Sequence, residues 1–111
     1  MFKEQLLKEI LEFVEKKRKL YFTKEEFLIH LWYKYNVLKQ GNGTIRFESI
    51  IVQLRRLARE GFLSKSKRPI PEWGFTYYIV YYPNRSKIRA YLMRHKRRKE
   101  QSLLVFSSGK Q

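Results

Sequence analysis

The chain has 111 residues, of which 43% are hydrophobic, and this length and composition favour a single folded domain over a disordered chain. Lys and Arg number 25 and Asp and Glu only 10, so the net charge of +15 favours a polyanion as partner, with nucleic acid first and a membrane surface second. The absence of cysteine excludes disulfides, thiolate metal sites and cysteine nucleophiles.

The first predicted helix covers residues 2–17. Six apolar residues recur in it at helical spacing, namely Leu6, Leu7, Ile10, Leu11, Phe13 and Val14. Their arc spans about half of the helix circumference, which is wider than one core contact requires. Two interpretations stay open: a small domain buries its first helix deeply, or a second subunit covers the excess. We expect a homodimer formed through this helix, with help from Ile88 and Leu92.

A short apolar run, LYF, predicts a brief strand before the second helix. Thr23 and Glu26 fit a capping box, in which each side chain satisfies a backbone donor of the other. Phe22 and Phe27 occupy the two positions of a hydrophobic staple. The second helix is therefore expected over residues 24–36, and the glycine-rich stretch KQGNGT then breaks the chain.

A third helix is predicted over residues 44–60, with Thr44 as its cap. Gly61 follows its last periodic residue and is expected to end it. Residues 62–67 and 75–82 are rich in β-branched and aromatic side chains and predict a hairpin. Its tip reads RPIPEWG, and the two prolines disfavour ladder pairing, so the tip should stand away from the sheet.

A fourth helix is predicted after Pro83, with Asn84 or Ser86 as its cap. Its apolar stripe is narrow and consists of Ile88, Tyr91 and Leu92. The basic run RHKRRK follows without an apolar face, so this segment is expected to be mobile or weakly helical. We expect a domain over residues 1–93 and a basic C-terminal extension over residues 94–111.

The order of these elements resembles a winged helix-turn-helix domain, an α+β fold with a three-helix core, a β-hairpin wing and here an additional C-terminal helix. The stretch IIVQLRRLAREGFLSKSK is similar to the recognition helix and first wing strand of MarR-like and ArsR-like regulators. The match lies in the leucine-spaced helix and its ending, Glu60-Gly61-Phe62-Leu63. The composition also resembles that of small regulators of thermophilic archaea and their viruses. The resemblance implies double-stranded DNA as partner, with helix 44–60 in the major groove and hairpin 62–82 as the wing.

The candidate DNA-binding residues fall into three groups. On the third helix, Ser49, Val52, Gln53 and Arg56 lie opposite or beside the apolar stripe, while Arg46 at the helix start suits a phosphate. Gln pairs bidentately with adenine, Arg pairs with guanine, and Val contacts a thymine methyl. On the wing, Lys65 and Lys67 share one strand face and Arg68 stands at the tip. In the extension, Arg94, Arg97 and Arg98 are expected to hold phosphates. For each position the alternative is an ordinary solvated side chain.

Several aromatic residues are expected in the core. Trp73 and Tyr78 should pack the base of the hairpin, and Tyr33 should pack in its helix. Either Trp32 or Tyr35 is equally well placed to be the partly exposed aromatic of that helix.

No enzymatic activity is expected. His30 and His95 are the only histidines, and no carboxylate or cysteine spacing around either predicts a metal site. No catalytic triad or phosphate-cradling glycine motif occurs in the sequence. We therefore expect no cofactor and no metal, and the sequence indicates no small-molecule ligand.

The sequence thus favours a sequence-specific, double-stranded DNA-binding regulator of transcription. Two alternatives stay open, since fold alone does not determine function. One is an RNA-binding or replication accessory module, and the other is a winged helix used for protein–protein contact. The charged first helix predicts no signal peptide, so we expect a cytoplasmic protein with no membrane partner, in the host cytoplasm if the source is a virus.

Overall fold

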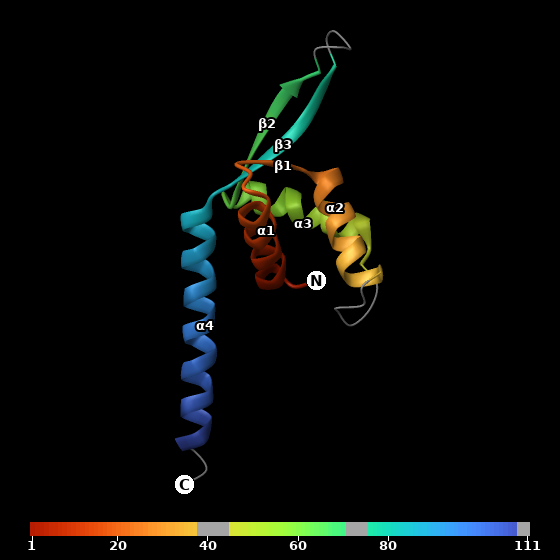
Figure 1. Ribbon diagram of the computed structural model, residues 1–111. Helices are drawn as coiled ribbons and strands as arrows, with labels where there is room; N and C mark the ends of the chain where they lie inside the picture. Colours follow the sequence, from red (N-terminus) through yellow and green to blue (C-terminus); the bar gives the residue numbers. More distant parts are fainter. Residues whose placement is uncertain (38–44, 71–75, 109–111) are drawn as a thin grey trace.

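The computed structural model describes residues 1–37, 45–70 and 76–108, with side chains up to residue 97. The elements in chain order are α1 (Lys3–Lys17), β1 (Phe22–Thr23), α2 (Lys24–Trp32), the π-helical turn η1 (Tyr33–Val37), α3 (Phe47–Arg59), β2 (Leu63–Pro69), β3 (Tyr77–Pro83) and α4 (Arg85–Ser108). The described residues therefore form an α+β fold, with four α-helices and a three-stranded antiparallel sheet (Figure 1).

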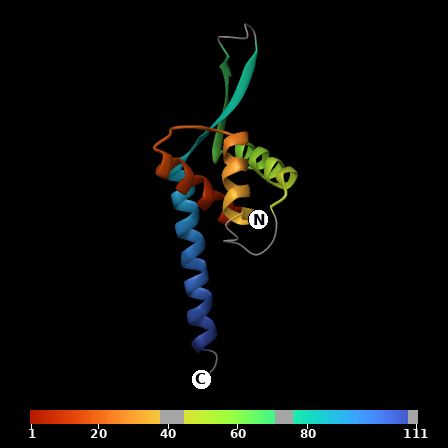
Figure 2. The ribbon, with the colours of Figure 1, turned by 45° about the vertical axis from the view of Figure 1, so that its right-hand side comes forward.

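The sheet has the strand order β1-β3-β2. β1 contributes only two pairs, Phe22 with Tyr81 and Thr23 with Val80, whereas β2 and β3 pair along seven residues. The outer part of the hairpin is thus two-stranded and stands away from the helices, while α4 leaves the body in the opposite direction (Figures 1 and 2).

The core lies between α1, α2 and α3 and is closed by the base of the sheet and by α4. Leu6, Leu7, Ile10 and Val14 of α1 are completely buried. Part of their cover comes from α4, because Ile88 is completely buried in the same cluster. The wide apolar arc of the first helix is therefore covered within one chain, as the deep-burial interpretation expects. A dimer through this helix stays a prediction, but its motivating surface is occupied.

Helix α2 begins where the capping box predicts. The Glu26 amide donates to Thr23 Oγ1 at 3.2 Å, and the Thr23 amide donates to Glu26 Oε1 at 3.0 Å. The staple is also confirmed, since the rings of Phe22 and Phe27 lie 5.3 Å apart. After Trp32 the helix widens into η1, which ends at Val37, one residue beyond the predicted end of the helix.

Helix α3 begins at Phe47, three residues later than predicted. Its N-cap is Arg46, which has an extended backbone and makes no side-chain cap bond. The prediction of Thr44 as the cap is therefore wrong, and Thr44 and the glycine turn lie outside the described residues. The predicted end is confirmed: Gly61 has φ +88°, and the amides of Gly61 and Phe62 donate to the carbonyls of Ala58 and Leu57. These two bonds are those of a Schellman cap, which needs a left-handed residue.

The base and sides of the hairpin differ from the prediction in two respects. Pro69 pairs opposite Tyr77 within the ladder, because β2 is an edge strand and the missing N–H of a proline is tolerated there. Tyr78 is exposed and so does not pack the hairpin base, since it pairs with Arg68 in the two-stranded part of the hairpin, beyond the residues that pair with β1. Tyr33 is also exposed, whereas Tyr35 is buried. Trp73 and Pro71 lie outside the described residues.

Helix α4 is capped by Asn84, whose Oδ1 accepts from the Lys87 amide at 3.2 Å. The helix then continues to Ser108 without a break at Met93, so residues 94–108 of the expected basic extension are helical. The division between residues 93 and 94 stays a prediction. Within the part of the chain that the structure describes, no helix has the length and apolar character to cross a membrane.

Candidate nucleic-acid interface

The outer face of α3 carries a row of arginines. Ile50, Leu54 and Leu57 are buried and turn one side of the helix to the core. At about 100° per residue, the opposite side presents Glu48, Val52, Arg55 and Arg59, with Arg56 beside them. All five of these side chains are exposed. Arg55 and Arg59 were not among the predicted residues, although the spacing of the buried leucines points to them.

The candidate DNA-binding side chains of α3 are not equally accessible to a ligand. Arg46, Ser49, Val52 and Arg56 are exposed, but Gln53 is half-buried and its amide donates to Ser49 Oγ at 3.3 Å. The other amide atom of this side chain, Oε1, is buried and has no hydrogen-bond partner among the described residues. Gln53 and Arg56 border a cavity of about 330 Å³ whose other wall is the start of α1. The centre of the exposed face is therefore displaced from Gln53 towards Arg55 and Arg59.

The hairpin extends this basic surface. Lys65 and Lys67 are exposed and stand opposite Tyr81 and Ile79 on one face of the ladder. That face is the core face at the base of the sheet, because Tyr81 is buried with its ring 5.8 Å from that of Phe22. Burial raises the pKa of Tyr81, and the positive charge of Arg55 opposes this rise. Arg55 therefore lies within electrostatic range of Tyr81 at the hairpin base, and α3 contacts β2.

Arg68 does not stand at the hairpin tip as predicted. It belongs to β2, on the ladder face opposite to Lys65 and Lys67. Its guanidinium donates to the Tyr82 hydroxyl and lies 4.7 Å from the ring centroid of Tyr21. The hydrogen bond to Tyr82 is the main cause of the raised pKa of Arg68. The side chain thus reaches from the outer part of β2 to Tyr21 and Tyr82, and these interactions compete with a DNA contact by Arg68.

The basic residues of α4 are separated from the others. Arg94 and Arg97 are exposed, and the side chain of Arg98 lies outside the described set. α4 points away from the hairpin in both views (Figures 1 and 2). The structure therefore brings the residues of α3 and β2 together, and leaves those of α4 as a second basic element.

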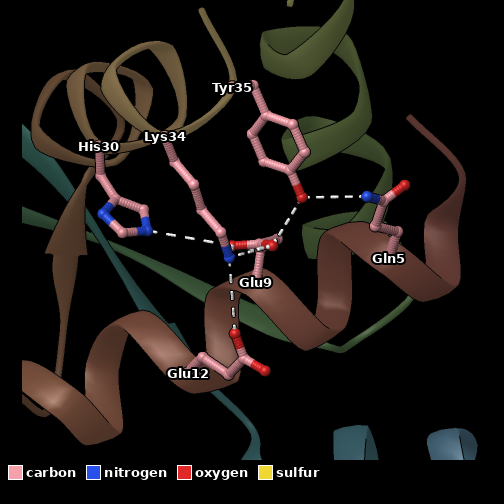
Figure 3. A network of polar contacts seen from close by, with 6 residues as sticks. All are labelled: Gln5, Glu9, Glu12, His30, Lys34 and Tyr35. Carbon is pink, nitrogen blue, oxygen red and sulfur yellow. Dashed lines mark hydrogen bonds and ion pairs between the residues drawn. The ribbon is translucent and has the colours of Figure 1, made fainter. Parts of the chain in front are cut away.

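A buried polar network joins α1 to α2 and η1 (Figure 3). Glu9 is buried and accepts from Lys34 Nζ and from the Tyr35 hydroxyl, both at 2.7 Å. Gln5 donates to the Tyr35 hydroxyl at 2.9 Å, and His30 Nε2 lies 3.9 Å from Glu9. Burial is the largest cause of the lowered pKa of His30. These contacts satisfy a carboxylate that would be costly to bury alone, and they fix the π-helical turn against α1.

Both histidines have carboxylate neighbours from another helix, which the sequence spacing did not indicate. His30 lies beside Glu9, and His95 Nε2 lies 2.6 Å from Glu4 Oε2. Among the residues with described side chains, no group of three or more potential ligands is arranged to hold a metal ion.

Comparisons with protein-family models, with curated proteins and with solved structures found no match to the chain. The function is therefore argued from the geometry and charge of the surfaces described above.

Proposed function

We propose that this chain is a winged-helix protein that binds double-stranded DNA in a sequence-specific manner and regulates transcription. In this arrangement α3 enters the major groove and the β2–β3 hairpin lies beside it as the wing. The support from the fold is the order of elements, helix, strand, two helices and hairpin, together with the strand order β1-β3-β2. A sheet of this order places the hairpin next to the end of α3.

The main support for the proposal is that the arginines on α3 are exposed and unpaired. Arg55, Arg56 and Arg59 are exposed and form no ion pair with a carboxylate of the described residues. Some cations elsewhere on the body are paired, such as Lys34 with Glu9 and Arg89 with Glu15, whereas Lys8 and Lys16 of α1 are exposed and also have no ion pair among the described residues. The opposite side of α3 packs in the core, so these three guanidinium groups face outward. Unpaired guanidinium groups suit the phosphates and guanine edges of a duplex.

The test compares two variants of equal charge. Arg55→Gln with Arg59→Gln removes two cations from the proposed interface, and Lys8→Gln with Lys16→Gln removes two from the exposed side of α1. Fluorescence anisotropy with a random duplex gives Kd as a function of salt. We expect the arginine variant to flatten the plot of log K against log salt by about 0.9 for each phosphate that the variant no longer neutralises. The lysine variant should retain the slope of the natural protein. Equal slopes for the two variants would refute α3 as the contact.

A second experiment tests sequence specificity. Selection from a random duplex library should yield a consensus, and duplex RNA at matched salt should bind more weakly, because its major groove is too narrow for a reading helix. Tighter binding to RNA or to single strands would favour the RNA-binding or replication alternative. A salt slope of only about one charge on random DNA would favour a protein-contact role.

A further inference from the structure

The outer side of α2 and η1 carries an apolar stripe that no described residue covers. Ile29, Trp32, Tyr33 and Val37 are exposed by 66%, 46%, 54% and 46%. They recur at helical spacing on the side opposite to Phe27, Leu28, Leu31 and Tyr35, which are buried. Single exposed apolar residues are ordinary, but a row of four containing two aromatic rings is a contiguous patch of the kind that marks an interaction site.

The charged residues of the segment that carries this stripe cancel. Residues 24–37 contain two lysines and two glutamates with His30 between them, so the segment is neutral in a chain of net charge +15. The ammonium of Lys34 is drawn to the other side of the turn, where it binds Glu9 at 2.7 Å and lies 3.8 Å from Glu12 (Figure 3). Lys24 lies 4.0 Å from Glu25. The network described above therefore removes positive charge from the stripe as well as fixing η1.

The absence of net charge on this segment indicates which kind of molecule the stripe can bind. Nucleic acid requires unpaired cations, which the stripe lacks and α3, β2 and α4 supply. A second copy of the chain meets electrostatic repulsion at those basic surfaces, since both copies carry +15. Two copies can approach closely at the stripe, where apolar burial is available and the segment itself carries no net charge.

We propose that the α2–η1 stripe is the homodimer interface of this protein, with two copies related by a two-fold axis. In an antiparallel pairing of the two helices the axis passes near Tyr33, because this residue lies midway between Ile29 and Val37 in the sequence. Trp32 and Tyr33 then pack against the same pair of the second copy, and Ile29 packs against Val37. Aromatic rings at the centre of an interface supply much of its binding energy. A stable interface buries about 800 Å² on each partner. The four side chains therefore form only the centre of the contact, and residues around them complete it.

Sedimentation equilibrium of the full chain, at concentrations up to tens of micromolar, tests this assignment. The natural protein should form a dimer. Tyr33→Lys places two like charges at the axis and should weaken the dimer by at least about tenfold, as expected for a central interface residue. Ile29→Lys should act in the same direction. The matched control is Leu20→Lys, which adds the same charge at an apolar side chain that is 75% exposed before β1 and should leave the dimer unchanged.

A spectroscopic measurement locates the contact independently. The chain has two tryptophans, so a Trp73→Phe variant reports on Trp32 alone. Its emission should shift to shorter wavelength as the concentration passes through the dimer Kd, and Tyr33→Lys in this background should abolish the shift. Circular dichroism confirms that each variant is folded.

Two sedimentation results would overturn the assignment: a natural protein that stays monomeric throughout the range, or equal weakening by Tyr33→Lys and Leu20→Lys. If Tyr33→Ala weakens the binding of random DNA and leaves the monomer–dimer equilibrium unchanged, the stripe binds nucleic acid and the assignment is overturned. The salt slope of the arginine variants on random DNA is measured separately, so failure of the dimer leaves the test of DNA binding intact.

Discussion

In the proposed DNA complex, Arg56 and Arg94 are expected to make two different kinds of contact. Arg56 lies on the exposed side of α3, within reach of base edges if this helix enters the groove. We expect Arg56→Ala to weaken binding to a selected site by about 1–3 kcal/mol, with a smaller effect on random DNA. Arg94→Ala should weaken both by similar factors, because a phosphate contact carries no sequence information. Competition binding with selected and random duplexes measures the contrast, and equal losses for Arg56→Ala would assign that side chain to phosphate.

Gln53 differs from Arg56 because its amide is already engaged. It must leave Ser49 before it can pair with an adenine, and its buried Oε1 must be brought out from beside the start of α1. We expect Gln53→Ala to reduce specific binding by less than Arg56→Ala. If the two substitutions cost the same at the selected site, the Gln53 side chain turns outward on DNA.

The buried side chain of Tyr35 links the stability of the fold to pH. Burial, followed by the hydrogen bond to Glu9, raises the pKa of Tyr35 from 10.0 to about 12. The folded protein thus holds this proton more tightly than the unfolded chain. The resulting stability is fully present below pH 10 and is lost as the pH rises towards 12.

Tyr35→Phe should therefore lower the free energy of unfolding by about 1.5–3 kcal/mol at neutral pH, the range for a hydrogen bond to a charged group. In this variant the free energy of unfolding should also fall less steeply above pH 10 than in the natural protein. Tyr77→Phe is the control, since its side chain is exposed on the hairpin and lies outside both the Glu9 network and the α2–η1 stripe. Urea unfolding at pH values on both sides of 10 gives both quantities, and an identical decline in Tyr35→Phe would contradict the assignment.

At the scale of elements, the contribution of α4 to DNA affinity is the easiest to measure separately from that of the other elements. Removal of residues 94–111 takes away five basic residues of the run after Met93 and Lys110, while Ile88, Tyr91 and Leu92 stay packed on the body. If the far half of α4 holds phosphate, the shortened protein should lose affinity for selected and random duplexes by similar factors. The plot of log K against log salt should flatten by about 0.9 for each phosphate that the removed residues neutralise. An unchanged slope would leave α3 and the hairpin to hold the DNA alone.

A full-length variant separates charge from helix length. Replacement of Arg94, Lys96 and Arg97 by Gln keeps α4 intact and should reproduce most of the slope change. If only truncation changes the slope, the helix acts by its reach or its packing and not by these charges.

The elements that sequence reasoning predicted well are those determined by residues near one another. Thr23 and Glu26 are three positions apart, so the start of α2 follows from their own bonds. Gly61 ends α3 for an equally local reason, since its positive φ requires no distant partner. The start of α3 was misplaced because Thr44 has the right side chain for a cap, but the extended residue before the helix is Arg46.

The candidate site was harder to predict because it depends on packing between distant segments. The availability of Gln53 depends on the start of α1, about fifty positions away in the chain. The use of Arg68 depends on Tyr21 and Tyr82, which only the sheet register brings to it. The same holds for α1, whose excess apolar arc is covered by α4 from the other end of the sequence. Helical spacing shows that a face needs cover, and it does not show which element covers it.

At the scale of the whole molecule, the two proposed interfaces should respond to salt in opposite directions. Added salt screens the attraction between α3 and phosphate, so DNA binding weakens. It also screens the repulsion between two copies of charge +15, so the dimer should strengthen or stay constant. Sedimentation equilibrium and anisotropy over the same salt series measure both trends. A dimer that dissociates as salt rises would indicate an interface held by ion pairs, which the neutral α2–η1 stripe does not provide.

The projection of α4 from the body also determines how the protein moves through solvent. The radius of gyration is 17.1 Å and the extents are 69 × 30 × 24 Å. A compact domain of this length has a radius of gyration of about 13 Å. A single copy therefore experiences the friction of a larger sphere and should leave a gel-filtration column early. Elution volume alone would make a monomer resemble a dimer, and the chain shortened after Met93 should lose most of this apparent excess in size while its mass falls only slightly.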